Sequence, residues 1–358
     1  MTIVIIGAGI VGLALARELA RRGQTVRLVD PRQPASEASW AAAGRLSVSA
    51  EAEGPGAMFE LCRRAAAIYP DFVRELEEES GLTAAYRAEG ALFLYHSEAE
   101  RAALEGRFGW QRELGVPAVH VDAREVRILE PEASAAGGYF LPGDCQVDNR
   151  LLCAALVESC RKAGVTFLQT SVSEVTWQGD RVTGAGLVDG SRLAADVVVN
   201  AAGAWASRIA APGPPIIVQP VKGHMLAVAT EGWALAHVVQ DDTVYLAPRA
   251  GDRVLIGSTI EHFGYDKAID PAAISNLRTA AHRLVGCLAE ATMADAWTGL
   301  RPAVVRGGPR IGPGSLPGYF LAVGHYRNGI LLAPLTAQLL APVIGGAEPD
   351  PLLTPFLP

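Results

Sequence analysis

The residues with the clearest chemical meaning are three glycines near the start of the chain, at positions 7, 9 and 12, followed by Asp30. In a turn between a strand and a helix, the first glycine allows a tight bend, the second lets the backbone approach a pyrophosphate, and the third lets the helix pack against the strand. The N–H groups at the start of such a helix bind anions. An acid about 20 residues further on accepts a hydrogen bond from a ribose hydroxyl. The pattern therefore predicts a dinucleotide site.

The segments around these residues have the order that such a site needs. Residues 3–6 are apolar and β-branched, residues 13–20 have helical spacing, and residues 25–29 form a second apolar run that ends at Asp30. A glycine-rich surface turn, which is the alternative, does not require this order. Because a carboxylate in this position disfavours a 2′-phosphate, the pattern indicates NAD or FAD rather than NADP.

Length and composition set broad limits. With 358 residues, half of them hydrophobic, the chain can form two domains with a large core. A net charge of −7 argues against nucleic-acid or membrane partners and favours small molecules or other subunits. The apolar start lacks preceding basic residues and is too short to span a bilayer, so we expect a cytoplasmic protein. Five cysteines without a C-x-x-C pair indicate buried thiols rather than a disulfide framework or a metal site.

The dinucleotide fold resumes late in the sequence. Residues 196–205 read as an apolar strand that runs into small residues, which is typical of a parallel strand buried on both faces with its carboxyl end beside a ligand. Residues 216–229, 243–247 and 253–258 are strands with short connections, which predicts an inserted antiparallel domain. Helices are expected at residues 60–81, 98–114, 148–163 and 270–284 and in a last segment up to about residue 344, where Pro334 must kink the helix or lie in its first turn.

Two later residues are candidates for binding a substrate. Arg301 lies directly before a proline, a rigid setting that suits bidentate binding of a carboxylate, but it could also be a surface arginine paired with an acid. Tyr245 lies in an alternating strand, where a core tyrosine is common. Residues 38–46 are small enough to pack against a flat ligand and could equally form an alanine-rich helix.

Four separated parts of the chain resemble one family, the FAD-dependent D-amino-acid oxidase superfamily, and within it the glycine oxidase branch. The first two are GAGIVG from residue 7 and SWAAAG from residue 39; then come VKGHML, TVYLAPR and LIGST, and finally WTGLRP with GHYRNGILLAPLT. The resemblance implies an α/β fold with a Rossmann-like FAD-binding domain and an inserted, mostly antiparallel substrate-binding domain. The implied FAD-binding domain comprises residues 1–85, 142–215 and 286–358, and the implied substrate-binding domain residues 86–141 and 216–285.

The resemblance also implies the site. FAD would lie extended and non-covalently bound, because no cysteine adjoins the flavin stretches. Arg301, Tyr245 and Arg327 would position the substrate carboxylate, and Arg45, Ser47 and Ile260 would line the substrate pocket. The implied cofactor contacts are Gly7, Gly9, Ile10, Val11, Gly12, Asp30, Ser39, Ala42, Ala43, Gly44, Arg45, Leu46, Val172, Ala202, Gly203, Trp205, Arg301, His325, Tyr326, Arg327, Asn328, Gly329 and Ile330.

The implied reaction is oxidation of glycine or an N-substituted glycine by hydride transfer to flavin N5. The resulting imine hydrolyses to glyoxylate and an amine, and O2 is reduced to H2O2. In the glycine oxidase branch this supplies the glycine-derived imine for thiamine thiazole synthesis, and those enzymes form tetramers, so a homo-oligomer is expected. The alternatives are an oxidase that removes an N-carboxymethyl group from a larger amino acid, a quinone-coupled D-amino-acid dehydrogenase, and a flavin-binding scaffold without turnover.

Two residues depart from the glycine oxidase pattern. Arg45 stands where that pattern has a methionine, and Ile260 replaces another residue beside the substrate. The Arg45 cation could bind a second carboxylate of the substrate or could pair with the FAD phosphates. Residues 47–51 are expected to form the entrance loop.

Overall fold

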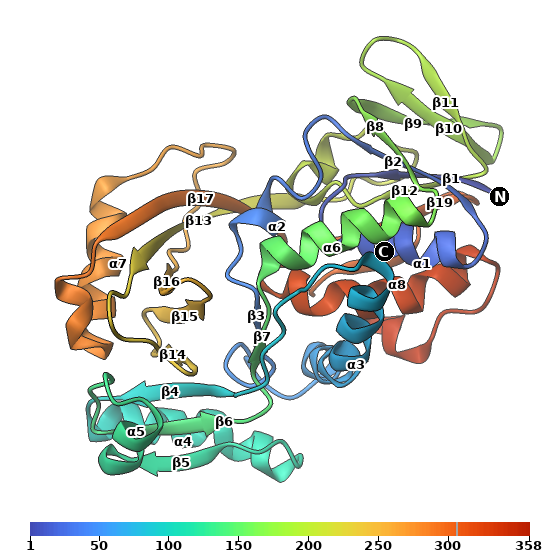
Figure 1. Cartoon of the computed structure of the whole chain (residues 1–358). Helices are drawn as coiled ribbons and strands as arrows, with labels where there is room; N and C mark the ends of the chain where they lie inside the picture. Colours follow the sequence, from blue (N-terminus) through green and yellow to red (C-terminus); the bar gives the residue numbers. More distant parts are fainter. Residues whose placement is uncertain (306) are drawn as a thin grey trace.

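The computed structural model describes residues 1–305 and 307–358, and two large sheets organise it (Figure 1). The five strands from β19 to β8 run parallel, and β18 pairs antiparallel with β19 at one edge. This is the expected parallel sheet, to which the late strand β12 returns. The order of this six-stranded sheet is β18 (Arg310–Pro313), β19 (Tyr319–Val323), β12 (Val197–Asn200), β1 (Thr2–Ile6), β2 (Thr25–Asp30) and β8 (Thr166–Gln169).

The glycine turn joins β1 to helix α1 (Ile10–Arg21). Gly7 has φ +105°, and a Cβ on it would lie 2.4 Å from the Ala201 carbonyl oxygen. A Cβ on Gly12 would lie 2.0 Å from the carbonyl oxygen of Gly7, so α1 can pack this closely only because both residues are glycine. The predicted order of strand, turn, helix and strand is confirmed by this geometry.

The two faces of the parallel sheet are covered differently, and the alternation of side chains along β1 shows it. Ile3 and Ile5 belong to the core shared with the helices, whereas Val4 and Ile6 pack with a small antiparallel sheet on the other face. The helices are α1, α3 (Ala57–Ser80), α6 (Asn149–Lys162) and α8 (Gly329–Ile344), and the small sheet is β9 (Val172–Gln178), β10 (Arg181–Leu187) and β11 (Arg192–Ala194).

Helix ends agree with the expected signals. Asp148 accepts hydrogen bonds from the first turn of α6, and α3 ends at Gly81, whose φ of +74° is left-handed. Pro334 lies inside α8 and not in its first turn. Residues 326–344 are apolar and long enough to cross a membrane, but 72% of this segment is buried inside the protein, which is typical of a core helix.

The second sheet has eight strands, and all its pairs are antiparallel except β14 with β4. It unites strands from both segments that were expected to form the inserted domain. Helices α4 (Glu98–Glu113), α5 (Ala123–Leu129) and α7 (Pro271–Leu284) accompany it. The strand order is β17 (Met293–Val304), β13 (Val218–Ala229), β16 (Arg253–Gly257), β15 (Tyr245–Arg249), β14 (Val238–Gln240), β4 (Ala91–Tyr95), β6 (Gly137–Leu141) and β5 (Val119–Asp122).

The structure corrects one predicted boundary. Residues from 286 onward were assigned to the FAD-binding domain, but β17 pairs with β13 from Val218–Val304 to Val228–Met293 and is therefore an edge strand of the eight-stranded sheet. The chain rejoins the parallel sheet only at β18. Because β13 and β17 are the two longest strands and reach toward the parallel sheet, they carry residues of the second sheet to the boundary (Figure 1).

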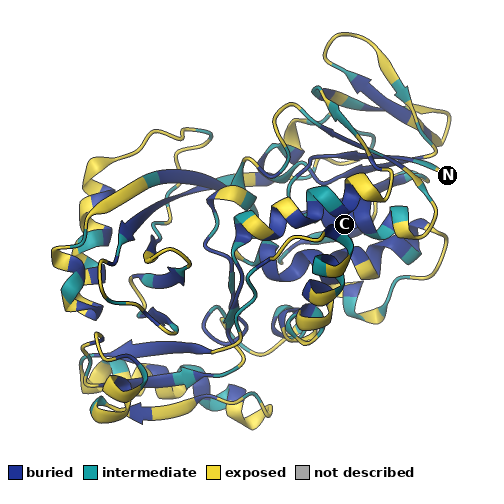
Figure 2. Ribbon diagram, in the orientation of Figure 1, coloured by how far each residue is buried: buried dark blue, intermediate teal, exposed yellow. Residues whose placement is uncertain are grey.

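Burial follows the layers of the fold. Figure 2 shows that the sheet strands are largely buried and that exposed residues gather on outer helix faces and loops.

All five cysteines are free; Cys62, Cys153 and Cys160 are buried as expected, whereas Cys145 and Cys287 are partly exposed. The remaining elements are α2 (Ala38–Ala41), the antiparallel pair β3 (Arg45–Leu46) and β7 (Cys145–Gln146), and the 3-10 turns η1 (Gly203–Arg208), η2 (Gly286–Ala289), η3 (Tyr326–Asn328) and η4 (Pro351–Phe356).

Candidate active site

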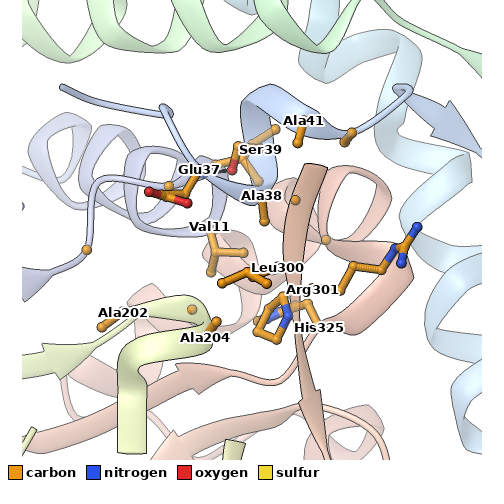
Figure 3. Close-up of a pocket in the computed structure, with 18 of the residues that line it drawn as sticks. Val11, Glu37, Ala38, Ser39, Ala41, Ala202, Ala204, Leu300, Arg301 and His325 are labelled. Carbon is orange, nitrogen blue, oxygen red and sulfur yellow. Dashed lines mark hydrogen bonds between the residues drawn. The ribbon is translucent and has the colours of Figure 1, made fainter. Parts of the chain in front are cut away.

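A continuous cavity of about 750 Å³ runs along the carboxyl ends of the parallel strands to the second sheet. Figure 3 shows residues from distant parts of the chain around it, among them Ser39, Ala202, Arg301 and His325. All but three of the site residues expected from the sequence line this cavity. The structure therefore brings the two predicted groups, for the dinucleotide and for the substrate, to one place.

The three exceptions are Gly12, Leu46 and Ile260. Gly12 faces the carbonyl of Gly7 and provides close packing instead of a surface for a ligand. Leu46 is buried in the core because side chains alternate along β3 and Arg45 takes the cavity side. Ile260 is half exposed and follows the end of β16, where the preceding two residues turn toward Arg301. It lies outside the lining of the cavity, and its place beside the substrate stays a prediction.

At the dinucleotide end, the start of α1 offers an open backbone. A Cβ on Gly9 would meet nothing closer than Ser39 Oγ at 3.4 Å, so there is space in front of this residue. The Ile10 N–H donates to the same Ser39 Oγ at 2.9 Å. Asp30 accepts from the Ala8 N–H at 2.9 Å, and burial raises the pKa of its carboxyl group although this hydrogen bond opposes the change.

Residues 38–46 were expected either to pack against a flat ligand or to form an alanine-rich helix, and the structure distinguishes the two. The helix is only four residues long and ends at Ala41, and Ala42 is already extended. Gly44 has φ +64°, and a Cβ on it would lie 2.1 Å from the Val147 carbonyl oxygen. The chain is thus a short helix followed by a tight extended stretch, and Ala42, Ala43 and Gly44 line the cavity.

At the other end, Arg301 projects from β17. Its Nη1 donates to the Thr259 carbonyl oxygen at 3.1 Å, and its Nη2 donates to Ser258 Oγ at 2.6 Å. A Cβ on Gly223 of β13 would lie 2.3 Å from Nη2, so glycine at this position makes room for the guanidinium. Burial lowers the pKa of Arg301, but an arginine keeps its charge in proteins. The result is a fixed cation that faces the cavity.

Tyr245 lies on β15 near Arg301. Its hydroxyl contacts Met225 Sδ at 3.1 Å, and glycine at 257 leaves room for it because a Cβ there would lie 2.6 Å from the hydroxyl oxygen. The guanidinium of Arg45 stacks on the tyrosine ring at 4.3 Å from its centroid. This contact places Arg45 at the substrate end of the cavity.

Glu51 is the residue that sequence reasoning missed. Its Oε1 lies 3.2 Å from Arg45 Nη1 and 2.7 Å from Arg327 Nη2, so one carboxylate oxygen joins two guanidiniums. The loop that carries it is fixed by the buried Asp144, which accepts hydrogen bonds from the N–H groups of residues 48, 49 and 50. The sequence signal was weak, since a single acid in a loop is ordinary, and only its closeness to the unusual Arg45 pointed to a role.

Comparison with known proteins identifies the family. The family described as FAD dependent oxidoreductase, or DAO, matches residues 2–342. The chain belongs to this family. The resemblance seen in the sequence is confirmed, and so are the expected α/β fold and the FAD cofactor.

The relatives of this FAD-dependent oxidoreductase include glycine oxidases. Glycine oxidase of Geobacillus kaustophilus is 33% identical over 99% of this chain and 95% of its own. A crystal structure of glycine oxidase from that species has a TM-score of 0.93, with 32% identity, and covers 99% of this chain and 97% of its own. An iminodiacetate oxidase from Chelativorans sp. has a TM-score of 0.92 and 29% identity, with 99% and 98% covered. The bifunctional protein ThiO/ThiG of Synechocystis sp. is 34% identical over 99% of this chain, which spans 53% of that longer protein.

The dinucleotide end of the cavity fits FAD. The open backbone at Gly9 and the start of α1 suit a pyrophosphate, and Asp30 has the place expected for a ribose contact. No cysteine is among the described residues that line the cavity, so non-covalent binding stays the prediction for this oxidoreductase.

His325 is buried beside the cofactor end of the cavity. Its Nε2 lies 3.0 Å from Thr336 Oγ1, and its backbone pairs with Ala303 at the end of β17. Burial lowers the pKa of His325 from 6.5 to about 4, so its ring is neutral at pH 7. Its role in this structure is packing and hydrogen bonding, at a position that also lines the cavity.

The buried imidazole predicts a loss of stability in acid. Because the folded-state pKa lies below that of the unfolded chain, unfolding takes up a proton as the pH falls through the range from 6.5 to about 4. At about pH 5 the loss amounts to roughly 2 kcal/mol of unfolding free energy. His325→Gln keeps a donor toward Thr336 but has no imidazole to protonate. Between pH 7 and about pH 5, we expect the unfolding free energy of this variant, measured by urea unfolding, to fall by about 2 kcal/mol less than that of the wild type. Parallel pH profiles of the two proteins would contradict the neutral, buried ring.

Proposed function

We propose that this FAD-dependent oxidoreductase is an amine oxidase that acts on the α-carbon of glycine or of N-substituted glycines. The observation that carries the proposal is the fixed guanidinium of Arg301, which faces the cavity at the end opposite the dinucleotide site. The glycine oxidase of Geobacillus kaustophilus, with 33% identity over 99% of this chain, supports the same substrate class.

The first task of the chain is to orient the substrate. Nη1 of Arg301 donates to the carbonyl oxygens of Thr259 and Lys222, and Nη2 donates to Ser258 Oγ, so the guanidinium is held in one place. The N–H groups that remain, on Nη2 and Nε, bind the α-carboxylate in a fork. Tyr245 adds a hydroxyl beside it. When the carboxylate is fixed, the direction of the α-carbon hydrogens is fixed as well. Holding the reacting groups in this orientation is one way in which an enzyme raises the rate.

The second task is to keep the amine neutral. The guanidiniums of Arg45, Arg301 and Arg327 lie around the substrate end, and nearby cations disfavour an ammonium ion and so lower its pKa. A neutral amine has the lone pair that stabilises the developing imine. No general base of the protein is assigned, because the hydrogen leaves the α-carbon with its electron pair.

FAD, when bound, supplies the acceptor for this hydride, and dioxygen then takes up the two electrons and leaves as hydrogen peroxide. Water adds to the imine and releases glyoxylate with ammonia, or with the substituted amine. For glycine the balance is one glycine, one O2 and one water to one glyoxylate, one ammonia and one H2O2. Delivery of the imine to thiamine synthesis, which the resemblance implies, stays a prediction.

Product analysis tests the proposal. The purified holoenzyme is incubated with glycine or sarcosine in air, and glyoxylate and peroxide are measured together. Equal amounts of the two products without any added acceptor are expected. Turnover only with an added quinone would favour the D-amino-acid dehydrogenase alternative, and failure of every amine would favour the scaffold.

A further inference from the structure

The charges around the cavity are unequal at its two ends. At the dinucleotide end Asp30 and Glu37 are balanced by Arg32 and Arg208. At the substrate end the described lining residues include three guanidiniums, from Arg45, Arg301 and Arg327, and one carboxylate, from Glu51. A glycine with a neutral amine brings one negative charge, so one positive charge remains without a partner from the substrate.

Of these three guanidiniums, only that of Arg45 has a buried nitrogen without a hydrogen-bond partner among the described residues. Its side chain is 9% exposed, and its Nη2 donates to Ser47 Oγ at 3.0 Å and to Gln240 Oε1 at 2.6 Å. Its Nε is buried and has no hydrogen-bond partner among the described residues. The guanidinium is therefore incompletely hydrogen-bonded within the described residues, and an unsatisfied buried donor costs free energy.

Glu51 shows where an acid fits. A single oxygen of Glu51, Oε1, forms ion pairs with both Arg45 and Arg327. Each of these two guanidiniums could bind a whole carboxylate, but here they share one oxygen atom. Arg45 also stacks on Tyr245, which places its charge at the substrate end and not at the glycine turn where FAD phosphates would lie. This position favours contact of Arg45 with the substrate over contact with the FAD phosphates.

We infer that the substituent on the amine nitrogen carries a second acidic group, and that Arg45 together with Arg327 binds it while Arg301 binds the α-carboxylate. The substrate class is a dianionic N-substituted glycine. Its two negative charges neutralise the positive net charge that three guanidiniums and one carboxylate leave at the substrate end. The inference rests on the proposed function. It assigns Arg45 to specificity, in a position where the glycine oxidase pattern has an apolar residue.

Two matched pairs of small molecules test this. Iminodiacetate and sarcosine differ only by a carboxylate on the N-methyl group, and oxydiacetate and methoxyacetate are the ether analogues, which lack the nitrogen needed for oxidation. The holoenzyme is titrated with the ethers by calorimetry, and kcat/KM is measured for the amines. We expect the dicarboxylate of each pair to be favoured by about 10- to 100-fold, the effect of a charge-assisted hydrogen-bonded pair.

Arg45→Met should bring both ratios close to one, because methionine fills the space without a charge. Arg63→Met, which removes an exposed arginine paired with Glu60 on α3, should leave both ratios at their wild-type values. If Arg45 instead served the reduced cofactor, the variant would slow both amines equally and leave the ether ratio unchanged.

The outcomes separate the inference from the function on which it rests. Oxidation of sarcosine or glycine without any preference for the dicarboxylates in the wild type overturns the inference and leaves the proposed function intact. Failure of all amines to react overturns the proposed function, and the ether pair still decides whether the second acid site exists. The wild-type ratios suffice for this decision if Arg45→Met does not fold.

Discussion

Replacing Arg301 by leucine is expected to lower kcat/KM for glycine by roughly 30- to 5000-fold, which corresponds to about 2–5 kcal/mol for a broken buried charge pair. The carboxylate would lose both hydrogen bonds and its counter-ion, so KM should rise. The α-carbon would also lose its fixed orientation, so kcat should fall as well. Steady-state peroxide formation over a range of glycine concentrations measures both constants.

Two further variants show whether the effect is specific to this guanidinium. Arg301→Lys keeps the charge without the planar fork and should recover part of the loss, mainly in KM. Arg74→Leu removes an exposed arginine of α3, which is paired with Asp71 and Glu78, and should change neither constant. FAD content should stay at the wild-type level in all three. A change of less than about threefold in kcat/KM for Arg301→Leu would remove Arg301 from the substrate site.

Replacing Gly9 by alanine is expected to weaken FAD binding by about 10- to 100-fold while the protein still folds. Gly9 has φ −72°, which any residue adopts, and an added Cβ would contact only Ser39 Oγ at 3.4 Å. The methyl group would occupy the space through which the pyrophosphate approaches the backbone at the start of α1. Flavin fluorescence during titration of the apoprotein gives the dissociation constant, and thermal unfolding of the apoprotein checks the fold.

Gly12→Ala is the matched comparison, because Gly9 leaves space for the cofactor whereas Gly12 allows close packing of α1 against the turn. A Cβ on Gly12 would lie 2.0 Å from the Gly7 carbonyl oxygen, so this variant should destabilise the apoprotein itself. We therefore expect Gly9→Ala to separate cofactor binding from folding and Gly12→Ala to affect both. Wild-type FAD affinity in Gly9→Ala would show that the cofactor does not approach this backbone.

Local sequence patterns predicted the parts of the fold that local chemistry determines. The glycine turn depends on residues within one short segment, and the caps of α3 and α6 depend on Gly81 and Asp148 alone. The caps were found because their hydrogen-bonding and steric reasons lie in neighbouring residues. The glycine turn was found from its local spacing, although a Cβ on Gly7 would also meet the carbonyl oxygen of the distant Ala201. Arg301 and Tyr245 needed the family resemblance, because an arginine or a tyrosine in a strand has many ordinary roles.

Long-range pairing accounts for the errors. No residue pattern near β17 indicates that this strand pairs with β13, so β17 was assigned to the wrong domain. The turn after β16 directs Ser258 and Thr259 toward Arg301 and leaves Ile260, which was expected in the pocket, half exposed. Glu51 joins Arg45 to Arg327, which lies 276 positions after Glu51, and no local pattern in the sequence shows this pairing.

Anaerobic reduction of the bound cofactor shows whether an amine held by Arg301 delivers its hydride to FAD. The holoenzyme is mixed without oxygen with glycine, sarcosine or iminodiacetate, and the absorbance of oxidised flavin is followed. We expect at least one of these amines to bleach the flavin, and we expect bleaching in Arg301→Leu to be far slower at the same amine concentration. A holoenzyme that carries FAD and stays fully oxidised with all three amines would rule out oxidation of glycine-type amines at this site.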